Sequence, residues 1–419
     1  MVAGRLGNDG TSVPSRRTHE ATGGGDTPVI RCNPEQTFHF FPVPTDIHFG
    51  YGTLAKLPEL IHSLPAQRVF VVTDPGIRAA GILQSVLNLL GAAGIAFEVY
   101  AEVKPDSGSR LIGEAADHAR RCKAEAIIGI GGGSSLDTAK AVATLLANPG
   151  TILDYTGLHQ VRNRLPPLIA IPTTAGTGSE VSLWSVFTND DTGLKVAVGS
   201  VYVYPSIALC DPELTLNLPP TITAATGMDA LAHGIECYTN KACQPISAAL
   251  ALNAIELIGK QLRNAVHNGN NRDSRYAVLL ASTMAGIAMN PTRLGLAHAL
   301  AMPLGSWDLR VPHGIAIAVT LPRVMKFNCE AAPERFTHVA RALGEPIEQS
   351  TSSEAALRAV EAVERLAGDI QIPKGLGEYG VRPSHVPRVV DEAMKSGNVA
   401  VNPRATSKEQ LATILQQSL

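Results

Sequence analysis

Between Gln67 and Pro172, short runs rich in β-branched residues alternate with segments of helical periodicity. The runs are RVFVVTD, AFEVYAEV, AIIGIGGG and LIAIPTT, and the helical segments between them are ILQSVLNLLGAAG, RLIGEAADHARRC and LDTAKAVATLLAN. Strands and helices at this spacing predict right-handed βαβ crossovers and a parallel sheet covered on both faces. Nucleotide-binding folds are built in this way.

The pattern changes after LNLPP, at residues 216–220. Before it, VSLWSVFTND and LKVAVGS predict a hairpin and IALCD one more strand; after it, Ala- and Leu-rich helical patterns continue to the C-terminus. Helices are expected over 223–239, 246–268 and 275–289, with several more over 333–419. The predicted fold class is therefore α/β plus all-α. A nucleotide-binding parallel-sheet domain (37–220) is followed by a C-terminal helical domain (221–419), and the polar residues 1–36 are predicted to be a disordered tail.

Composition excludes several classes of partner. The chain has 419 residues with a formal net charge of -2, so no overall field favours nucleic acid or an anionic membrane. No apolar run approaches the roughly 18 to 20 residues of a membrane span, and the opening lacks the apolar core of a signal peptide. The six cysteines form no CxxC pair. A reducing, cytoplasmic location is therefore predicted, with a small molecule as the partner.

A glycine-rich turn predicts an anion site. In IGIGGGSSLD, a strand leads into a helix through Gly131, Gly132 and Gly133, and Ser134 adds a hydroxyl at the helix start. Backbone amides exposed there can bind a phosphate, although glycines kept for packing would give the same pattern. Asp74 ends another strand, where its carboxylate could accept hydrogen bonds from a ribose diol and favour NAD, or could simply belong to a turn before Pro75.

Four further residues suggest a metal. Asp229 and His233 lie one helical turn apart in GMDALAHGIE, and His298 and His313 follow in apolar, glycine-flanked contexts. Any one of them alone would more often be a satisfied core residue, but one carboxylate and three imidazoles form a first shell for iron(II) or zinc. A nucleotide domain followed by a metal site indicates hydride transfer at a carbonyl group, with the metal as Lewis acid.

At this point the sequence resembles the iron-dependent (group III) alcohol dehydrogenases. The motifs that carry the resemblance are GGGSSLDTAK, IPTTAGTGSE, GMDALAHGIE, GLAHALAMPLG and PHGIAIAVTLP, in family order, and it extends from about Phe41 to the C-terminus. It implies the fold shared with dehydroquinate synthase, NAD and Fe²⁺ as cofactors with Zn²⁺ as the other candidate metal, and an alcohol or aldehyde substrate. It also implies a homodimer or larger homo-oligomer.

Residue by residue, the resemblance places the metal ligands at Asp229, His233, His298 and His313. It places cofactor contacts at Asp74, Gly131, Gly132, Gly133, Ser134, Asp137, Thr173, Thr174, Thr177, Ser182 and Lys195. Of these, Gly132, Gly133 and Ser134 match the pyrophosphate loop, and Lys195 matches a lysine near the nicotinamide ribose.

The chain departs from the family pattern at three places. Met302 stands where many members carry a histidine that relays the proton, so the catalytic proton path is left to water and ribose hydroxyls, with Met302 as pocket wall. The usual Asn-Pro-Thr appears as Pro105, Asp106 and Ser107. Arg293 precedes His298 by five residues, and Arg310 precedes His313 by three.

Arg293 leads to a hypothesis about the substrate. A guanidinium near the metal could bind a carboxylate or phosphonate on an aldehyde or ketone, or it could form a salt bridge at a domain or subunit edge. Beside the dehydrogenase, the sequence leaves open a hydroxyacid-oxoacid transhydrogenase and a sugar-phosphate cyclase on the same fold. A non-catalytic binding protein agrees least with a complete ligand set beside a cofactor cleft.

Overall fold

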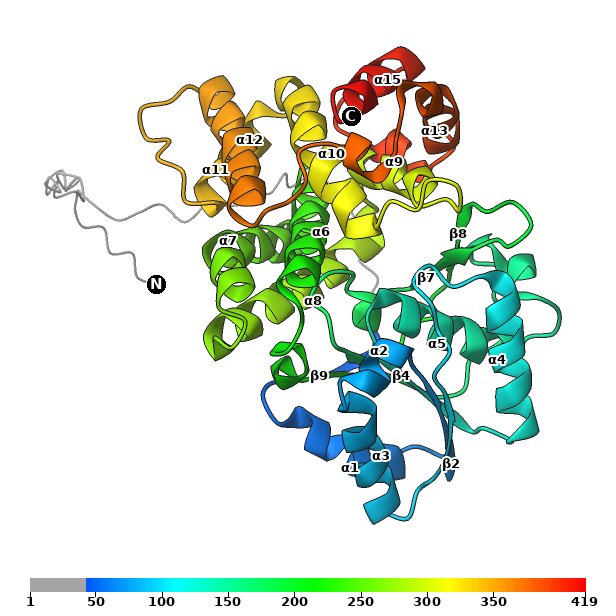
Figure 1. The fold of residues 1–419 in the computed structure, drawn as a ribbon. Coiled ribbons are helices and arrows are strands. Elements are labelled where there is room, and N and C mark those ends of the chain that lie inside the picture. The colour runs from blue at the N-terminus through cyan, green and yellow to red at the C-terminus, as the bar shows by residue number, and fades with distance from the viewer. Residues whose placement is uncertain (1–42) are drawn as a thin grey trace, which may run out of the picture. The chain divides into compact units, whose positions relative to one another are not determined.

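The computed structural model describes residues 43–419, so the tail predicted for residues 1–36 lies outside the described part. Six parallel strands form the larger sheet, in the order β1-β9-β6-β4-β2-β3 (Figure 1). They are β1 (Asp46–Phe49), β2 (Arg68–Val72), β3 (Ala96–Tyr100), β4 (Ala126–Gly131), β6 (Leu168–Pro172) and β9 (Ile207–Cys210). β2 pairs with β3 on one side and β4 on the other, so the strand order reverses between β2 and β4. Ligands bind beside such a reversal, at the carboxyl ends of the strands.

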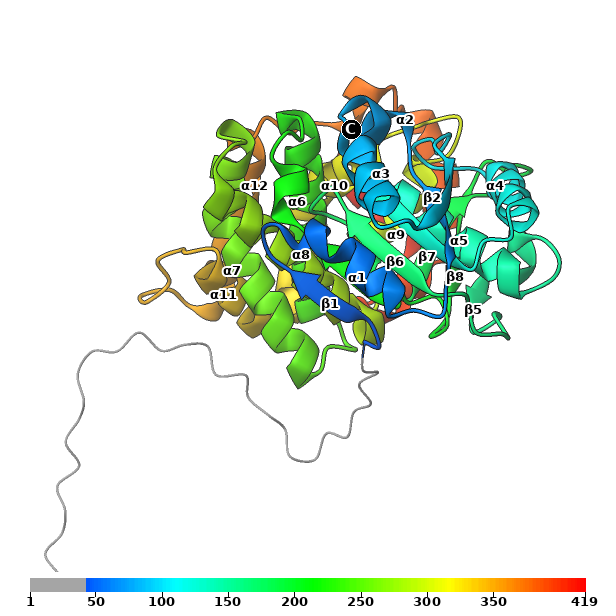
Figure 2. The ribbon, with the colours of Figure 1, turned by 90° about the horizontal axis from the view of Figure 1, so that it is seen from below.

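Helices cover both faces of this sheet, as predicted (Figure 2). They are α1 (Leu57–His62), α2 (Pro75–Ala79), α3 (Ile82–Ala92), α4 (Ser109–Arg121) and α5 (Gly133–Ala147). Successive side chains of a strand point to opposite faces: Phe70 and Val72 join the core under α4 and α5, whereas Val69 and Val71 join the core under α1 and α3. The continuous apolar runs in the sequence reflect this double burial.

The predicted hairpin is also present. β7 (Trp184–Thr188) pairs antiparallel with β8 (Lys195–Gly199), and the short β5 (Gly157–Leu158) completes a second, three-stranded sheet. The alternating pattern of strands and helices begins at Gln67 and therefore does not predict β1, which lies before it in the chain and has only four residues. β1 forms because it pairs with β9, a strand about 160 residues later in the chain.

From residue 220 onward the described chain is helical, which confirms the predicted fold class (Figure 1). The helices are α6 (Pro220–Thr239), α7 (Pro245–His267), α8 (Arg272–Thr292), α9 (Leu296–Leu304), α10 (His313–Asn328), α11 (Pro333–Ala342), α12 (Ser352–Asp369), α13 (Val386–Ala393), α14 (Gly397–Val401) and α15 (Lys408–Gln416). The sequence pattern did not predict α9 and α10 as helices. None of the helices in the described part is long and apolar enough to cross a membrane.

Candidate metal and cofactor site

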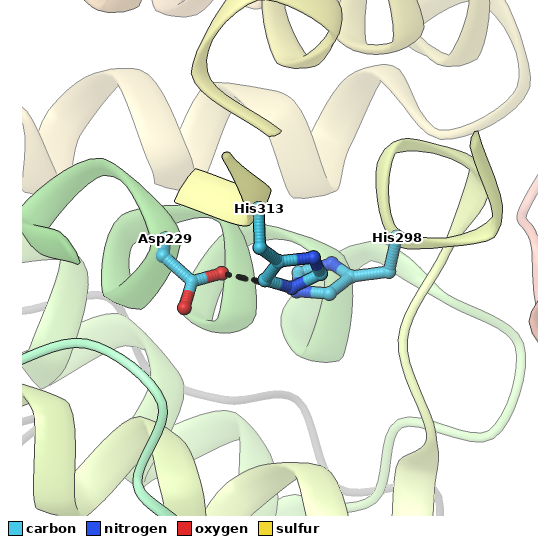
Figure 3. Close-up of side chains that lie close together, drawn as sticks. All are labelled: Asp229, His298 and His313. Atoms are coloured by element: carbon cyan, nitrogen blue, oxygen red, sulfur yellow. Dashed lines mark ion pairs between the residues drawn. The ribbon is translucent and has the colours of Figure 1, made fainter. Parts of the chain in front are cut away.

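Three segments of the helical part bring Asp229, His298 and His313 together (Figure 3). Asp229 lies in the middle of α6, His298 in the first turn of α9, and His313 is the first residue of α10, directly after Pro312. Their ligand atoms lie within 4.8 Å of one another. A carboxylate and two imidazoles at this separation can share one cation.

Three buried polar atoms of this cluster have no hydrogen-bond partner within residues 43–419. Asp229 Oδ1 lies 3.4 Å from His298 Nε2 and 3.8 Å from His313 Nε2. Asp229 Oδ1, His298 Nε2 and His313 Nδ1 are nevertheless buried without a hydrogen bond. Buried polar atoms are rarely left unpaired, because the loss of hydration costs about 1 to 3 kcal/mol for each. A bound metal would satisfy this cluster.

His233, the fourth predicted ligand, lies at the edge of the cluster. Its Nε2 is 3.8 Å from Asp229 Oδ1, and its ring stacks on that of His298 with the centroids 4.6 Å apart. Its Nδ1 is 3.2 Å from the carbonyl oxygen of Gly176. That contact fixes the ring and leaves Nε2 facing Asp229, which is how a second group commonly orients a ligating histidine.

The pKa values of Asp229, His233 and His313 suit cation binding, whereas His298 would release a proton when it binds a metal. Burial opposes ionisation of Asp229, but the surrounding imidazoles, His233 foremost, hold the pKa of its carboxyl below its usual range. Burial lowers the pKa of His233 to about 4 and that of His313 to about 3. For His298, burial is outweighed by the carboxylates of Glu236 and Asp229, which raise its pKa to about 9. An ionised carboxylate and neutral imidazoles are the forms that bind metal.

Glu236 is a functional candidate that the sequence analysis missed. One of its carboxylate oxygens is 2.6 Å from His298 Nδ1 and accepts the N–H of Gly295 at 2.8 Å, and the other accepts the N–H of Ala297 at 2.8 Å. Glu236 thus holds both the ring of His298 and the loop that leads to it. Its place in the sequence, three residues after His233 and seven after Asp229, puts it on the same face of α6 and was the available signal.

The glycine-rich turn lies at the reversal of the strand order, at the carboxyl end of β4. Gly131 ends β4, and Gly132 and Gly133 begin α5. A Cβ at Gly133 would lie 2.7 Å from a Thr177 methyl carbon, and one at Gly132 would lie 3.4 Å from the Thr174 side chain. A side chain at Gly133 would therefore collide with the loop after β6, whereas one at Gly132 would only be in contact with it, and α5 begins beside this loop.

Asp74 has the turn role that was considered for it, and its contact with a ribose stays a prediction. Its Oδ1 accepts the backbone N–H of Ile77 at 3.1 Å and so caps α2, as a turn aspartate does. Its Oδ2 accepts the hydroxyl of Ser135 at 2.8 Å, which holds the carboxylate beside Gly131 at the carboxyl end of β2. Thr173, at the end of β6, has a buried hydroxyl oxygen without a hydrogen-bond partner.

One cavity of about 340 Å³ joins the two halves of the site. Its lining includes, from the predicted cofactor set, Gly133, Ser134, Asp137, Thr177, Ser182 and Lys195, together with Asp229, His233, His298, His313, Met302 and Arg293. The remaining cofactor candidates do not line this cavity. They are Asp74, Gly131, Gly132, Thr173 and Thr174, at the ends of β2, β4 and β6. The cavity thus brings together the predicted metal ligands and six of the eleven predicted cofactor residues.

Some of the lining groups already have partners. Asp137 accepts the Ser179 hydroxyl at 2.6 Å and the N–H of Val186 at 3.0 Å, so its carboxylate supports the cavity wall. Lys195 Nζ lies 2.6 Å from Asp106 Oδ1, and the Ser134 hydroxyl accepts the N–H of Asp106 at 3.2 Å. The departure at Asp106 therefore has a structural consequence, because this residue links the turn at Ser134 to Lys195.

Comparison with known proteins agrees with this geometry. The model of the iron-containing alcohol dehydrogenases matches residues 44–212, and that of the C-terminal part of the Fe-containing alcohol dehydrogenase family matches residues 223–419. Choline dehydrogenase of Bacillus subtilis (strain 168) is 38% identical over 372 residues, covering 88% of this chain and 92% of its own length.

Solved structures agree as well. A 1,3-propanediol oxidoreductase superposes with a TM-score of 0.89 at 36% identity, covering 92% of this chain and all of its own. Sulfoacetaldehyde reductase from Bifidobacterium kashiwanohense, solved in complex with NAD⁺, superposes with a TM-score of 0.80 at 30% identity, covering 91% of this chain and 99% of its own. With matches across both halves of the chain and this conserved architecture, the protein belongs to the iron-containing alcohol dehydrogenases, a family of oxidoreductases.

Proposed function

We propose that the chain is an NAD(H)-linked, iron-dependent dehydrogenase that interconverts an alcohol with an aldehyde or ketone. The observation that carries the proposal is the shared cavity. It brings the cluster of Asp229, His298 and His313, with its unpaired buried Asp229 Oδ1 and His298 Nε2, to the glycine-rich turn at Gly133 and Ser134. Residues 37–220 would bind NAD and residues 221–419 the metal.

Asp229, His233, His298 and His313 would hold Fe²⁺, and Zn²⁺ would suit the same donors. When bound, the metal supplies Lewis acidity to the substrate oxygen, and the nicotinamide carries the hydride.

The residues of the chain bind the cofactor and position it beside the substrate. The amides at the start of α5 and the absence of a side chain at Gly133 allow a phosphate to approach, and Asp74 would accept hydrogen bonds from a ribose. Trp184 and Val186 add an apolar wall to the cavity, which would limit the access of water to a bound substrate. Met302 lines it too and has no titratable group, so we propose that the proton leaves through water and ribose hydroxyls.

The relatives leave the charge of the substrate open. Their names refer to a neutral diol, the cation choline and an anionic aldehyde. We also propose a cytoplasmic homo-oligomer, supported by the family and by the free thiols of the five described cysteines.

The test is anaerobic loading with Fe(II) followed by NADH oxidation with a series of aldehydes. Metal-dependent loss of NADH absorbance is expected, and no turnover of any carbonyl would overturn the proposal. In the reverse direction, release of free NADH from an alcohol distinguishes a dehydrogenase from a transhydrogenase, which would keep the cofactor bound.

A further inference from the structure

We propose that the part of the cavity lined by Arg293, Ser396 and Asn398 binds an anionic group on the substrate. The substrate class would be a small aldehyde, or its alcohol, that carries a sulfonate, phosphonate or carboxylate. This inference rests on the proposed function, since it assigns a substrate class to the same cavity. It adds two residues from the C-terminal segment that no sequence signal indicated.

The backbone of Arg293 is held in a conformation that non-glycine residues avoid. Arg293 caps α8 with φ 61° and ψ -166°. Its carbonyl oxygen accepts hydrogen bonds from Asn240 Nδ2 at 3.2 Å and from the Thr292 hydroxyl at 2.8 Å, and the Cys237 thiol lies 3.6 Å away. Such a conformation persists only where surrounding contacts enforce it, and it recurs at ligand-binding sites.

The same contacts fix Arg293 relative to the metal cluster. Glu236 accepts the N–H groups of Gly295 and Ala297, and Asn240 binds the carbonyl oxygen of Arg293. Glu236 and Asn240 are both anchored in or next to α6, the helix that carries Asp229. The segment from Arg293 to His298 is therefore attached to α6 at both ends, which holds the backbone of Arg293 in place relative to the metal ligand His298.

The guanidinium has no acidic partner. No carboxylate within residues 43–419 forms a salt bridge with Arg293, so the alternative of a salt bridge at a domain edge finds no support there. Its side chain is half-buried and packs on Gly397, where an added Cβ would lie 2.0 Å from Nη1. A positive charge held in a cavity without a counterion favours an anionic ligand.

The other charges of the cavity are matched. Lys195 is paired with Asp106, and the carboxylate of Asp137 is occupied by hydrogen bonds. Asp229 belongs to the cluster that would hold iron. Arg293 therefore carries the positive charge that remains unmatched among the described lining residues.

Two neutral donors stand beside it. Asn398 Oδ1 accepts the N–H of Leu294 at 3.4 Å, which leaves its amide nitrogen as a donor. The Ser396 hydroxyl oxygen accepts the N–H of Asn398 at 3.3 Å and keeps its own hydrogen. Both residues line the cavity with Arg293. A guanidinium with two such donors matches the several oxygens of a sulfonate or phosphonate better than the two of a carboxylate.

The experiment compares Arg293→Ala with Arg310→Ala in the iron-loaded enzyme. Arg310 is a matched control because it also has a positive φ, 51°, but it is exposed, bonds to the carbonyl oxygen of Trp307 and lies outside the cavity lining. KM and kcat are measured for NADH-dependent reduction of sulfoacetaldehyde, phosphonoacetaldehyde, succinic semialdehyde and neutral propanal. Choline oxidation serves as the cationic comparison.

Arg293→Ala is expected to raise KM for the anionic aldehydes roughly 10- to 100-fold and to change KM for propanal less than about twofold. Arg310→Ala should leave KM unchanged for the anionic aldehydes and for propanal. Gly397→Ala, which alters no charge but displaces the guanidinium, should raise KM for the anionic aldehydes as well. The wild-type enzyme should not oxidise choline. Among the anions, the largest effect identifies whether sulfonate, phosphonate or carboxylate is the group recognised.

A second readout needs no turnover. Ethanesulfonate should bind to the wild-type chain and to Arg310→Ala in calorimetric titration, and binding should be lost in Arg293→Ala. If the wild type reduces propanal but Arg293→Ala affects all aldehydes equally, the inference is wrong while the proposed function stands. If no carbonyl is reduced, the proposed function is wrong, and the ethanesulfonate titration alone then supports or overturns the anion site.

Discussion

At the scale of single residues, the position of His298 depends on Glu236. The carboxylate binds the imidazole at 2.6 Å and two backbone N–H groups at 2.8 Å, so its charge is surrounded by donors. In Glu236→Gln, one oxygen becomes an amide nitrogen that faces these donors. We expect iron affinity to fall about 10- to 100-fold, the usual effect of losing such a supporting group.

The measurement is the iron content after dialysis against a graded series of chelator concentrations. Glu256→Gln is the control, because Glu256 is a half-exposed acid on α7 that pairs with Lys260 and does not line the cavity. Unchanged affinity in Glu236→Gln would mean that the carboxylate merely shapes the loop. A melting temperature close to that of the wild type shows that the variant is folded.

A second residue, Lys140, affects the stability of the fold through its buried charge and has no role at the metal site. The Lys140 ammonium is fully buried and donates to the carbonyl oxygens of Ser182 and Trp184 at 3.0 and 2.8 Å and to the Ser182 hydroxyl at 3.1 Å. Burial nevertheless lowers its pKa from 10.5 to about 8. Lys140 thus stabilises the wall of the cofactor cavity while its charge remains costly.

This pKa predicts how stability depends on pH. Below pH 8, Lys140 is protonated in both states and the cost of burying its charge is fully present. Between about 8 and 10.5 the folded state releases the proton and the unfolded state keeps it, so the free energy of unfolding rises with pH. At about 1.4 kcal/mol per pKa unit the gain approaches roughly 3 kcal/mol.

Denaturant unfolding of the wild type and of Lys140→Met, from pH 7.5 to 10, checks this. The stability of the wild type relative to Lys140→Met should increase across the range. The exposed Lys260→Met should show no such trend, since its ammonium lies in solvent. A difference that stays constant with pH would show that Lys140 remains charged throughout.

At the scale of elements, the junction of β4 and α5 depends on the absence of a side chain. A Cβ at Gly133 would lie 2.7 Å from the Thr177 methyl carbon, closer than packed carbons allow. Gly133→Ala should therefore separate the two loops and weaken NADH binding roughly 5- to 100-fold. Titration of NADH fluorescence measures the effect.

Two comparisons make the cause testable. Gly113→Ala, in α4 with open space around it, should not alter NADH binding. Adding Thr177→Ser to Gly133→Ala removes the obstructing methyl group and keeps the hydroxyl, so binding should largely return. Without such recovery, the steric explanation fails and the glycine is needed for its backbone conformation.

At the scale of the whole molecule, the cavity exists because the sheet part and the helical part meet closely. Gly178, in the loop after β6 with φ 61°, faces Gly286 in α8, and a Cβ on Gly286 would lie 2.7 Å from Gly178 Cα. Asn290 on α8 bonds to the backbone of Leu183 and Val181, and the Thr283 hydroxyl bonds to Glu180. These contacts set the distance between the cofactor loops and the metal ligands.

Gly286→Ala should therefore disturb both stability and catalysis. The added methyl group meets backbone, which cannot rotate away, so we expect a loss of about 1 to 3 kcal/mol in the free energy of unfolding. Turnover should fall even with iron and NADH bound, because the hydride distance changes. Gly368→Ala in α12, where nothing lies within 4 Å of the added carbon, should be neutral or slightly stabilising. Equal melting temperatures for the two variants would contradict the proposed role of this contact.

The periodicity of the sequence was sufficient to predict elements whose burial repeats regularly along the chain. The runs around Phe70 and Ile128 are apolar at every position because both faces of the sheet are buried, and the four-residue spacing of Asp229 and His233 puts both side chains on one side of α6. The parallel sheet, the hairpin of the second sheet and the candidate ligand set could therefore be predicted. The four residues of β1 could not, because they form a strand only through pairing with β9.

By itself, the sequence determined which chemical groups the chain carries and in which elements most of them lie, because helical and strand periodicity are local properties. Only the tertiary structure decided which of those groups meet. It showed that Arg293 lines the metal cavity beside Ser396 and Asn398 with no salt bridge to any carboxylate of residues 43–419. It also showed that Glu236 holds His298 and that Asp106 pairs with Lys195. Hydrogen bonds and ion pairs between residues about 60 to 100 positions apart arise from packing, which no local pattern encodes.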